Sequence, residues 1–136
     1  MDMFNNSVEL QNLFCAIALG LVQLVLAVLA SVGARGMPWA LGPRDDGGAP
    51  LGKFGGRLER AYKNFLETFV FFAAAVLIDY ALNKSTEHSR LGAQIYLYAR
   101  ILYVPAYVLA IPFVRTLIWT AGVAGILLVM SAVWPG

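Results

Sequence analysis

The stretch that decides the fold is Arg60-Ala-Tyr-Lys-Asn64-Phe-Leu-Glu67-Thr-Phe-Val-Phe-Phe-Ala-Ala-Ala-Val-Leu-Ile78, an apolar run with a polar stripe at its start. Spacings of four and three residues place Arg60, Asn64 and Glu67 within about 60° of one another around a helix axis. Contact of such a stripe with lipid is costly, so we expect it to face protein or a polar cavity. The stripe is therefore the first candidate for a functional site.

The composition of the whole chain is that of a membrane protein. Of the 136 residues, 60% are hydrophobic and 13% are charged, and the mean hydropathy is +0.69. Soluble domains carry about 25% charged residues. The length predicts a single domain over residues 1–136. A net charge of +2 without a Lys/Arg cluster argues against nucleic-acid binding, and a lone cysteine without a Cys/His cluster predicts neither a disulfide nor a metal site.

Four apolar stretches are long enough to cross a bilayer, which takes about 20 residues in a helix. They are residues 10–32, 60–82, 91–111 and 113–133. Because lipid offers no partners to backbone groups, spans of this length are helices. We therefore predict an all-α protein, an integral membrane four-helix bundle in contact with the lipid bilayer.

The connections between these stretches differ in length and polarity. Residues 33–56 are rich in Gly and Pro and are expected to form an exposed loop. Residues 83–90 form a short polar turn. Pro112 is expected to end the third helix or to mark the corner before the fourth, because the residue before a proline disfavours the helical conformation.

Basic residues beside the spans are concentrated on one side of the predicted membrane. Lys84 and Arg90 are the basic residues of the opposite side. Since basic residues accumulate on the cytoplasmic side, we expect the first loop in the cytoplasm and both termini outside. The basic residues on the loop side are Arg35, Arg44, Lys53, Arg57, Arg60 and Arg115.

A second polar set is expected in the same half of the membrane as the stripe. Arg100, Tyr103 and Tyr107 recur at spacings of three and four and so share a helix face, and Arg115 begins the fourth stretch at that side. Guanidinium groups bind carboxylates in a bidentate manner, while a carboxylate and an amide suit an amino group or a peptide backbone. The combined set is complementary to a small zwitterionic peptide with extra carboxylates.

Each of these residues also has a structural interpretation. Glu67 and Arg100 could pair and hold two helices together, Asn64 could form an interhelical hydrogen bond, and the two tyrosines could serve packing. Arg115 could extend from the start of its helix to the membrane interface. The gathering of the whole set in one half of the membrane favours a polar site over separate pairs.

Three other residues are given structural roles. Gln23 in the first stretch is expected to make one interhelical hydrogen bond. Asp79, on a different face of the second stretch, is expected to pair with Lys84 or Arg90. Cys15 lies in apolar sequence and is expected to be buried as a small hydrophobic residue.

Three segments carry a resemblance to a known family. They are Gly42-Pro-Arg-Asp45, Arg57-Leu-Glu-Arg60-Ala-Tyr-Lys-Asn64-Phe-Leu-Glu67 and Tyr96-Leu-Tyr-Ala-Arg100-Ile-Leu-Tyr103-Val-Pro-Ala-Tyr107. With these segments and the four-span plan, nearly the whole chain resembles the MAPEG family, the membrane-associated proteins in eicosanoid and glutathione metabolism. Within that family, the chain resembles the bacterial branch.

The resemblance implies a homotrimer in a bacterial inner membrane, with glutathione as cosubstrate between neighbouring subunits at the cytoplasmic side. In catalytic members an arginine near the start of the fourth span favours the thiolate, and Arg115 is the candidate for this catalytic role. The motif match implies that the glutathione site is lined by Arg60, Asn64, Glu67, Arg100, Tyr103 and Tyr107.

Two classes of function follow from these expectations. The first is a glutathione-dependent membrane transferase or peroxidase that acts on a lipophilic small molecule. The second is a non-catalytic trimeric membrane scaffold, or an accessory subunit of a larger membrane complex, that retains the polar set for folding. A transporter fits less well, because the sequence has no pair of discontinuous helices. Glutathione binding distinguishes the first class from the others.

Overall fold

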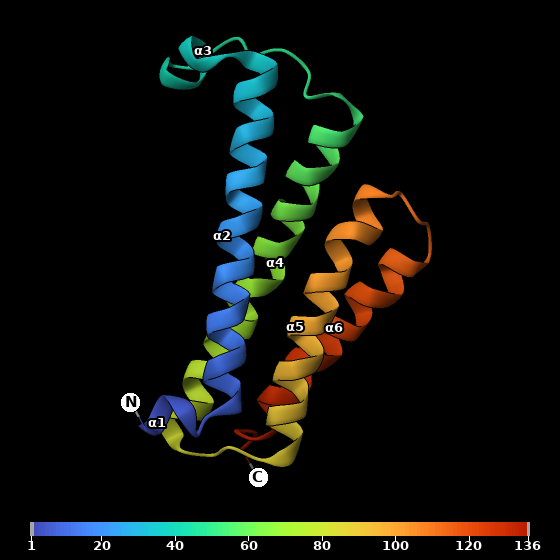
Figure 1. The fold of residues 1–136 in the computed structure, drawn as a ribbon. Helices are drawn as coiled ribbons and strands as arrows, with labels where there is room; N and C mark the ends of the chain where they lie inside the picture. Colours follow the sequence, from blue (N-terminus) through green and yellow to red (C-terminus); the bar gives the residue numbers. More distant parts are fainter. Residues whose placement is uncertain (1, 136) are drawn as a thin grey trace.

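The computed structural model describes residues 2–135, and every regular element in that range is a helix (Figure 1). The helices are α1 (Asp2–Asn5), α2 (Val8–Arg35), α3 (Met37–Leu41), α4 (Gly52–Leu82), α5 (Glu87–Val108) and α6 (Val114–Ser131). The predicted all-α class is confirmed. The long helices α2, α4, α5 and α6 run alongside one another, and the short helices α1 and α3 lie at opposite ends of α2.

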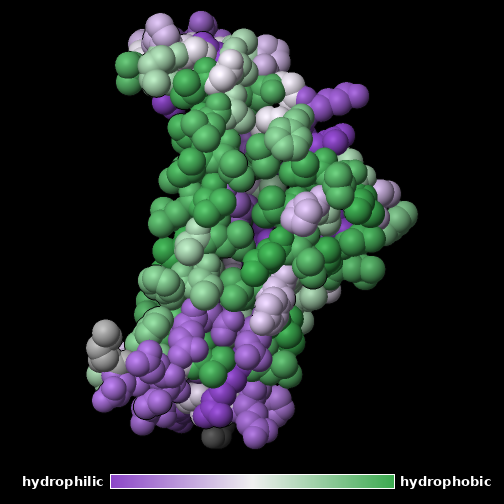
Figure 2. Space-filling view, in the orientation of Figure 1, coloured by the Kyte–Doolittle hydropathy of each residue, from purple (hydrophilic) through white to green (hydrophobic). Residues whose placement is uncertain are grey.

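The molecule has two distinct ends. Both termini and the α4–α5 turn lie at one end, which we call the terminal end, and α3 and the α5–α6 corner lie toward the other, the loop end (Figure 1). Figure 2 shows a largely apolar surface along the helices and a gathering of polar residues at the terminal end. This distribution is the one expected where helices leave the hydrocarbon and meet water.

Three of the four predicted spans have the length and apolarity needed to cross a membrane, namely α2, α4 and α6. α5 has 22 residues, enough for the roughly 30 Å of a hydrocarbon core. It is less apolar than the other three because it carries Arg90, Gln94 and Arg100. The passage of α5 through the membrane, and with it the complete four-helix bundle, stays a prediction.

Tyr96 of α5 lies at the centre of the core. Its ring stacks on Phe72 of α4 with 4.0 Å between ring centres, and its hydroxyl shares a 3.0 Å hydrogen bond with Thr68 Oγ1. Leu13 of α2 and Val129 of α6 close the cluster from the other sides. Because the buried hydroxyls of Thr68 and Tyr96 are hydrogen-bonded to each other, neither adds the free-energy cost of an unpaired polar atom to the core.

α5 and α6 form a closely packed hairpin. A Cβ on Gly125 would lie 2.6 Å from the carbonyl oxygen of Gly92, which is closer than side-chain atoms approach. Small residues allow two helix backbones to come into direct contact in this way. The hairpin therefore fixes the relative position of the functional residues that α5 and α6 carry.

The helix boundaries differ from the hydropathy-based ones at α4. This helix begins at Gly52, so the predicted loop of residues 33–56 is shorter and contains α3. Lys53, Arg57 and Glu59 lie in the added turns. Hydropathy marks where a helix enters lipid, whereas the hydrogen-bonded helix continues into the aqueous layer.

The end of α5 also differs from the prediction. The helix ends at Val108 rather than at residue 111, and Pro105 lies inside it. The alternative in which Pro112 marks the corner before the next helix is confirmed. Ala110 and Phe113 take positive φ values of 55° and 63°. The corner is thus made by backbone reversal at non-glycine residues, and Pro112 lies within the corner rather than at the end of the helix.

Cys15 is exposed in the single chain, so its predicted burial is wrong. α2 buries one narrow stripe at spacings of three and four residues, and Cys15 is one position away from it. A step of one residue turns a side chain about 100° around the helix. The residues of the buried stripe are Glu9, Leu13, Ala16, Gly20 and Gln23.

Candidate functional site

The predicted polar residues of α4 and α5 meet through Arg100. Its Nη1 donates a 2.9 Å hydrogen bond to Asn64 Oδ1, and its guanidinium carbon lies 4.3 Å from the centre of the Tyr103 ring. Only 1% of Arg100 is exposed. A cation over an aromatic face is stabilised by the ring quadrupole, so the tyrosine and the asparagine together hold the buried charge in place.

A second set of contacts lies nearer the loop end. Arg60 Nε donates a 3.1 Å hydrogen bond to the Tyr107 hydroxyl, and the Arg115 guanidinium carbon lies 5.0 Å from the centre of the same ring. The rings of Tyr103 and Tyr107 are 5.7 Å apart. The two tyrosines therefore connect arginines from three different helices.

An open pocket of about 230 Å³ lies beside these contacts. Asn64, Tyr103 and Arg115 line it, so it brings together one predicted site residue from each of α4, α5 and α6. Thr116 and Trp119 complete the lining and were not predicted. Trp119 was detectable in the sequence, because a residue four positions after Arg115 shares its helix face.

Glu67 does not join this set within the single chain. It is exposed, and among residues 2–135 it has no hydrogen bond or ion pair. A direct pair between Glu67 and Arg100 is therefore absent from the described chain, and contact between them through a bound ligand stays a prediction. On α4 the buried Ala61 and Thr68 lie to one side of Asn64, whereas Arg60 and Glu67 lie about 40° and 60° to the other side. The longer Arg60 side chain still reaches α5.

Arg100 retains unused hydrogen-bonding capacity. Its Nε and Nη2 are buried and have no acceptor among the described residues. A guanidinium group has five N–H donors, and leaving donors of a charged group unpaired in a buried place is costly. The structure thus contains a cation that an additional anionic or carbonyl group would complement.

Two structural roles expected from the sequence are not found. Asp79 forms no ion pair with Lys84 or Arg90 in the described chain, and its Oδ1 is buried without a partner. Gln23 is buried, but both polar atoms of its amide lack partners among residues 2–135. Asp79 lies instead beside Glu9, a residue that the sequence analysis did not select. The sequence signal that could have identified Glu9 is its position as a carboxylate directly before the uncharged residues 10–32.

Comparison with known families identifies a relationship over almost the entire chain. The model of the family described as the MAPEG family matches residues 12–133, which include every predicted site residue. No curated protein and no solved structure matches the chain.

Proposed function

The chain belongs to the MAPEG family, and from this membership we propose that it is a glutathione-dependent membrane transferase or peroxidase acting on a lipophilic substrate. Membership and the three apolar helices indicate an integral membrane protein with a function related to glutathione in general. The reaction, the cosubstrate and the residues that bind it are our proposal.

The observation that carries this proposal is the pocket where Asn64, Tyr103 and Arg115 converge. Arg115 is exposed, lines the pocket and lies over the Tyr107 ring. A guanidinium close to a thiol favours its thiolate, the reactive form. We therefore assign Arg115 the catalytic role of stabilising the glutathione thiolate. The thiolate displaces the leaving group of an electrophile, or cleaves the O–O bond of a hydroperoxide to give an alcohol and a sulfenic acid that a second glutathione converts into the disulfide and water.

The remaining predicted residues suit the binding of a small peptide with two carboxylates and one amino group. Arg60 supplies an exposed cation, and Glu67 supplies an exposed carboxylate with no partner in the described chain. Arg100 holds Asn64 and Tyr103 in position through a hydrogen bond and a cation–π contact. Its unpaired Nε and Nη2 favour a polar ligand nearby. In this proposal the main role of Arg100 is to position Asn64 and Tyr103 for ligand binding.

The pocket is open on one side, which suits a site completed by a neighbouring subunit. We propose a homotrimer in which α5 also crosses the membrane and completes the four spans, with the first loop in the cytoplasm of a bacterium and the termini outside. Trp119 provides an apolar wall that is 39% exposed. A lipophilic substrate would then reach the thiolate laterally from the bilayer.

A second candidate is a non-catalytic trimeric scaffold or an accessory subunit of a larger membrane complex. The specific observation in its favour is that Arg100 and Arg60 connect α4 directly to α5 by hydrogen bonds. Such ties would retain the polar residues for folding alone. Binding of glutathione separates the two candidates.

The deciding experiment is a calorimetric titration of the purified protein in detergent with glutathione. We expect saturable binding and the appearance of the ultraviolet absorbance of a thiolate. Arg115→Ala is expected to bind glutathione without forming the thiolate, while Lys53→Ala, which removes an exposed charge at the same end, should behave as the parent protein. Absence of binding by the parent protein would leave the scaffold as the better candidate.

A further inference from the structure

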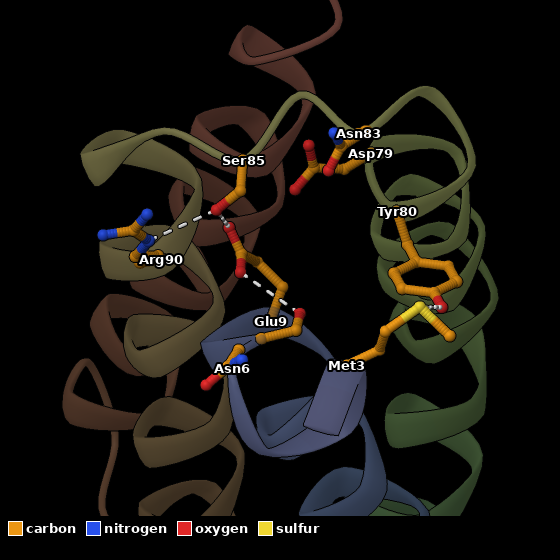
Figure 3. Close-up of a pocket in the computed structure, with 9 residues that line it drawn as sticks. Met3, Asn6, Glu9, Asp79, Tyr80, Asn83, Ser85 and Arg90 are labelled. Carbon is orange, nitrogen blue, oxygen red and sulfur yellow. Dashed lines mark hydrogen bonds between the residues drawn. The ribbon is translucent and has the colours of Figure 1, made fainter. Parts of the chain in front are cut away.

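The terminal end contains a second pocket, separate from the site at the loop end. It has a volume of about 340 Å³ and lies between the start of α2, the end of α4 and the α4–α5 turn (Figure 3). Glu9 and Asp79 line it, and each is only 2% exposed. Figure 3 shows both carboxyl groups turned toward the space beneath the α4–α5 turn.

Glu9 is surrounded by hydroxyl donors. Its Oε1 accepts hydrogen bonds from Ser85 Oγ at 2.7 Å and from Ser89 Oγ at 2.5 Å. Its Oε2 accepts a longer one from Ser7 Oγ at 3.5 Å. This arrangement suits a carboxylate, which is an acceptor only. Among the described residues, Glu9 Oε2 therefore has only this one long hydrogen bond.

Asp79 has no such support. Its Oδ1 is buried and has no hydrogen-bond partner among residues 2–135. Within the same range no lysine or arginine lies within 4.0 Å of either carboxylate. Arg90 is close, but its Nε donates to Ser85 Oγ at 3.2 Å instead. Two neighbouring buried carboxyl groups are costly to ionise together away from water, so the pair is stabilised either by a shared proton or by a bound cation.

We propose that this pocket binds a primary ammonium group joined to a phosphate, the chemistry of a phosphoethanolamine headgroup. An ammonium has three N–H donors, which match the unpartnered oxygen of Asp79 and the weakly bonded oxygen of Glu9. Arg90 at the rim supplies a guanidinium, which binds phosphate well. The inference rests on this pocket alone and is independent of the glutathione site.

Size and position favour this ligand over a bare metal ion. The pocket volume of about 340 Å³ greatly exceeds the space of one ion, since a water molecule occupies only about 30 Å³. Arg90 would repel a bare cation but attracts the phosphate of a zwitterion. The pocket also lies where apolar helices end (Figure 2), which is the depth at which lipid headgroups are found.

The first test uses the complete protein in detergent and four soluble probes: O-phosphoethanolamine, ethanolamine, O-phosphocholine and inorganic phosphate. Binding is measured by calorimetry and by the shift in unfolding temperature. We expect O-phosphoethanolamine to bind about ten-fold or more tightly than O-phosphocholine, whose quaternary nitrogen has no N–H donor. The proposal is overturned if these two probes bind equally well. It is also overturned if the protein binds phosphoethanolamine neither as the free compound nor as a lipid headgroup.

A second arm distinguishes a lipid from a free headgroup. The protein is placed in nanodiscs of phosphatidylcholine with or without phosphatidylethanolamine, and retained lipid is identified by native mass spectrometry. Selective retention of phosphatidylethanolamine without binding of soluble O-phosphoethanolamine assigns the site to the lipid. Binding of the soluble probe without lipid selectivity assigns it to the free compound, and both results support the proposed chemistry.

Variants test the residues. Asp79→Asn keeps the shape of the side chain and should weaken O-phosphoethanolamine or lipid binding at least about ten-fold. The matched control is Glu87→Gln, an exposed carboxylate of the first α5 turn outside the pocket, which should bind as the parent does. Arg90→Gln should weaken O-phosphoethanolamine binding but not that of ethanolamine. Unchanged binding by Asp79→Asn, or stabilisation through Asp79 by Mg²⁺ or Ca²⁺ but by no ammonium probe, overturns the proposal.

Discussion

The two ends of this protein hold buried charge to different extents. At the loop end Arg100 has an amide and an aromatic ring as partners, although its Nε and Nη2 have no acceptor among the described residues. At the terminal end Glu9 is held by serine hydroxyls, but neighbouring Asp79 has a bare oxygen. The difference shows that one buried charged group can stabilise the fold through its contacts, while another in the same protein lacks a partner and is available to a ligand.

This comparison predicts opposite responses to neutralisation. Where a buried charge is integrated into contacts, its removal should lower stability, because its partners lose their own compensation. Where a buried charge lacks a partner, its removal should leave stability unchanged or raise it.

The largest effect is expected from Arg100→Ala. This change removes a fully buried side chain and leaves Asn64 and the Tyr103 ring without their partner. The free energy of unfolding should fall by about 3–5 kcal/mol. Reversible unfolding in mixed micelles measures it, with Lys53→Ala as an exposed control. A loss below about 1 kcal/mol would show that Arg100 is not integrated into the fold.

The next effect concerns chemistry at the loop end. Arg115→Ala should lower turnover with glutathione and a lipophilic electrophile by about 100-fold, the scale found for loss of one group that stabilises developing charge. Glutathione affinity should change much less, because positioning belongs to other residues. Single-turnover kinetics separates the two quantities. Equal loss of affinity and turnover would instead place Arg115 among the binding groups.

Asp79→Asn tests the terminal end in the protein without added ligand. The change removes a buried, unpartnered charge and adds an amide donor beside Glu9. The free energy of unfolding should rise by about 1 kcal/mol. Unfolding of the parent and the variant in the same detergent, free of amine lipids, measures the difference. A clear fall in stability would indicate that Asp79 already has a stabilising partner.

The smallest effect is expected from Glu67→Gln. Glu67 is exposed and has no hydrogen bond or ion pair in the described part of the chain. The free energy of unfolding should therefore change by less than about 0.5 kcal/mol.

A double-mutant cycle sharpens this last point. Asn64→Ala with Arg100→Ala should show coupling of about 1 kcal/mol or more, whereas Glu67→Gln with Arg100→Ala should be additive. Strong coupling between Glu67 and Arg100 would show that they interact in the assembled protein. Both cycles use the same unfolding measurement.

Some features of the loop-end site could be predicted because they depend on local spacing. The intervals between Arg60, Asn64 and Glu67 place all three on one side of any α-helix, and the intervals from Arg100 to Tyr107 do the same on α5. The antiparallel packing of α4 and α5 then brings residues of both sets into contact. The two predicted helix faces need only the period of a helix and the cost of polar groups in lipid.

The partner of Arg100 could not be predicted in the same way. A rotation of α4 by a few tens of degrees decides whether Asn64 or Glu67 faces α5, and that rotation is set by packing of Thr68 and Phe72 on Tyr96. The contribution of Trp119 likewise depends on the close approach of Gly92 and Gly125. Shape complementarity between helices is a property of the assembled side chains.

The amino-acid sequence by itself thus determined the all-α membrane class, the apolar helices and the polar stripe, because hydropathy and helical period are local properties. Only the tertiary structure placed Glu9 and Asp79 in the lining of one pocket at the terminal end. It also decided that Asn64, rather than Glu67, is the hydrogen-bond partner of Arg100. Residues far apart in the chain meet according to helix rotation, tilt and length. Those quantities follow from the packing of the whole core, in which each helix limits the positions open to the others.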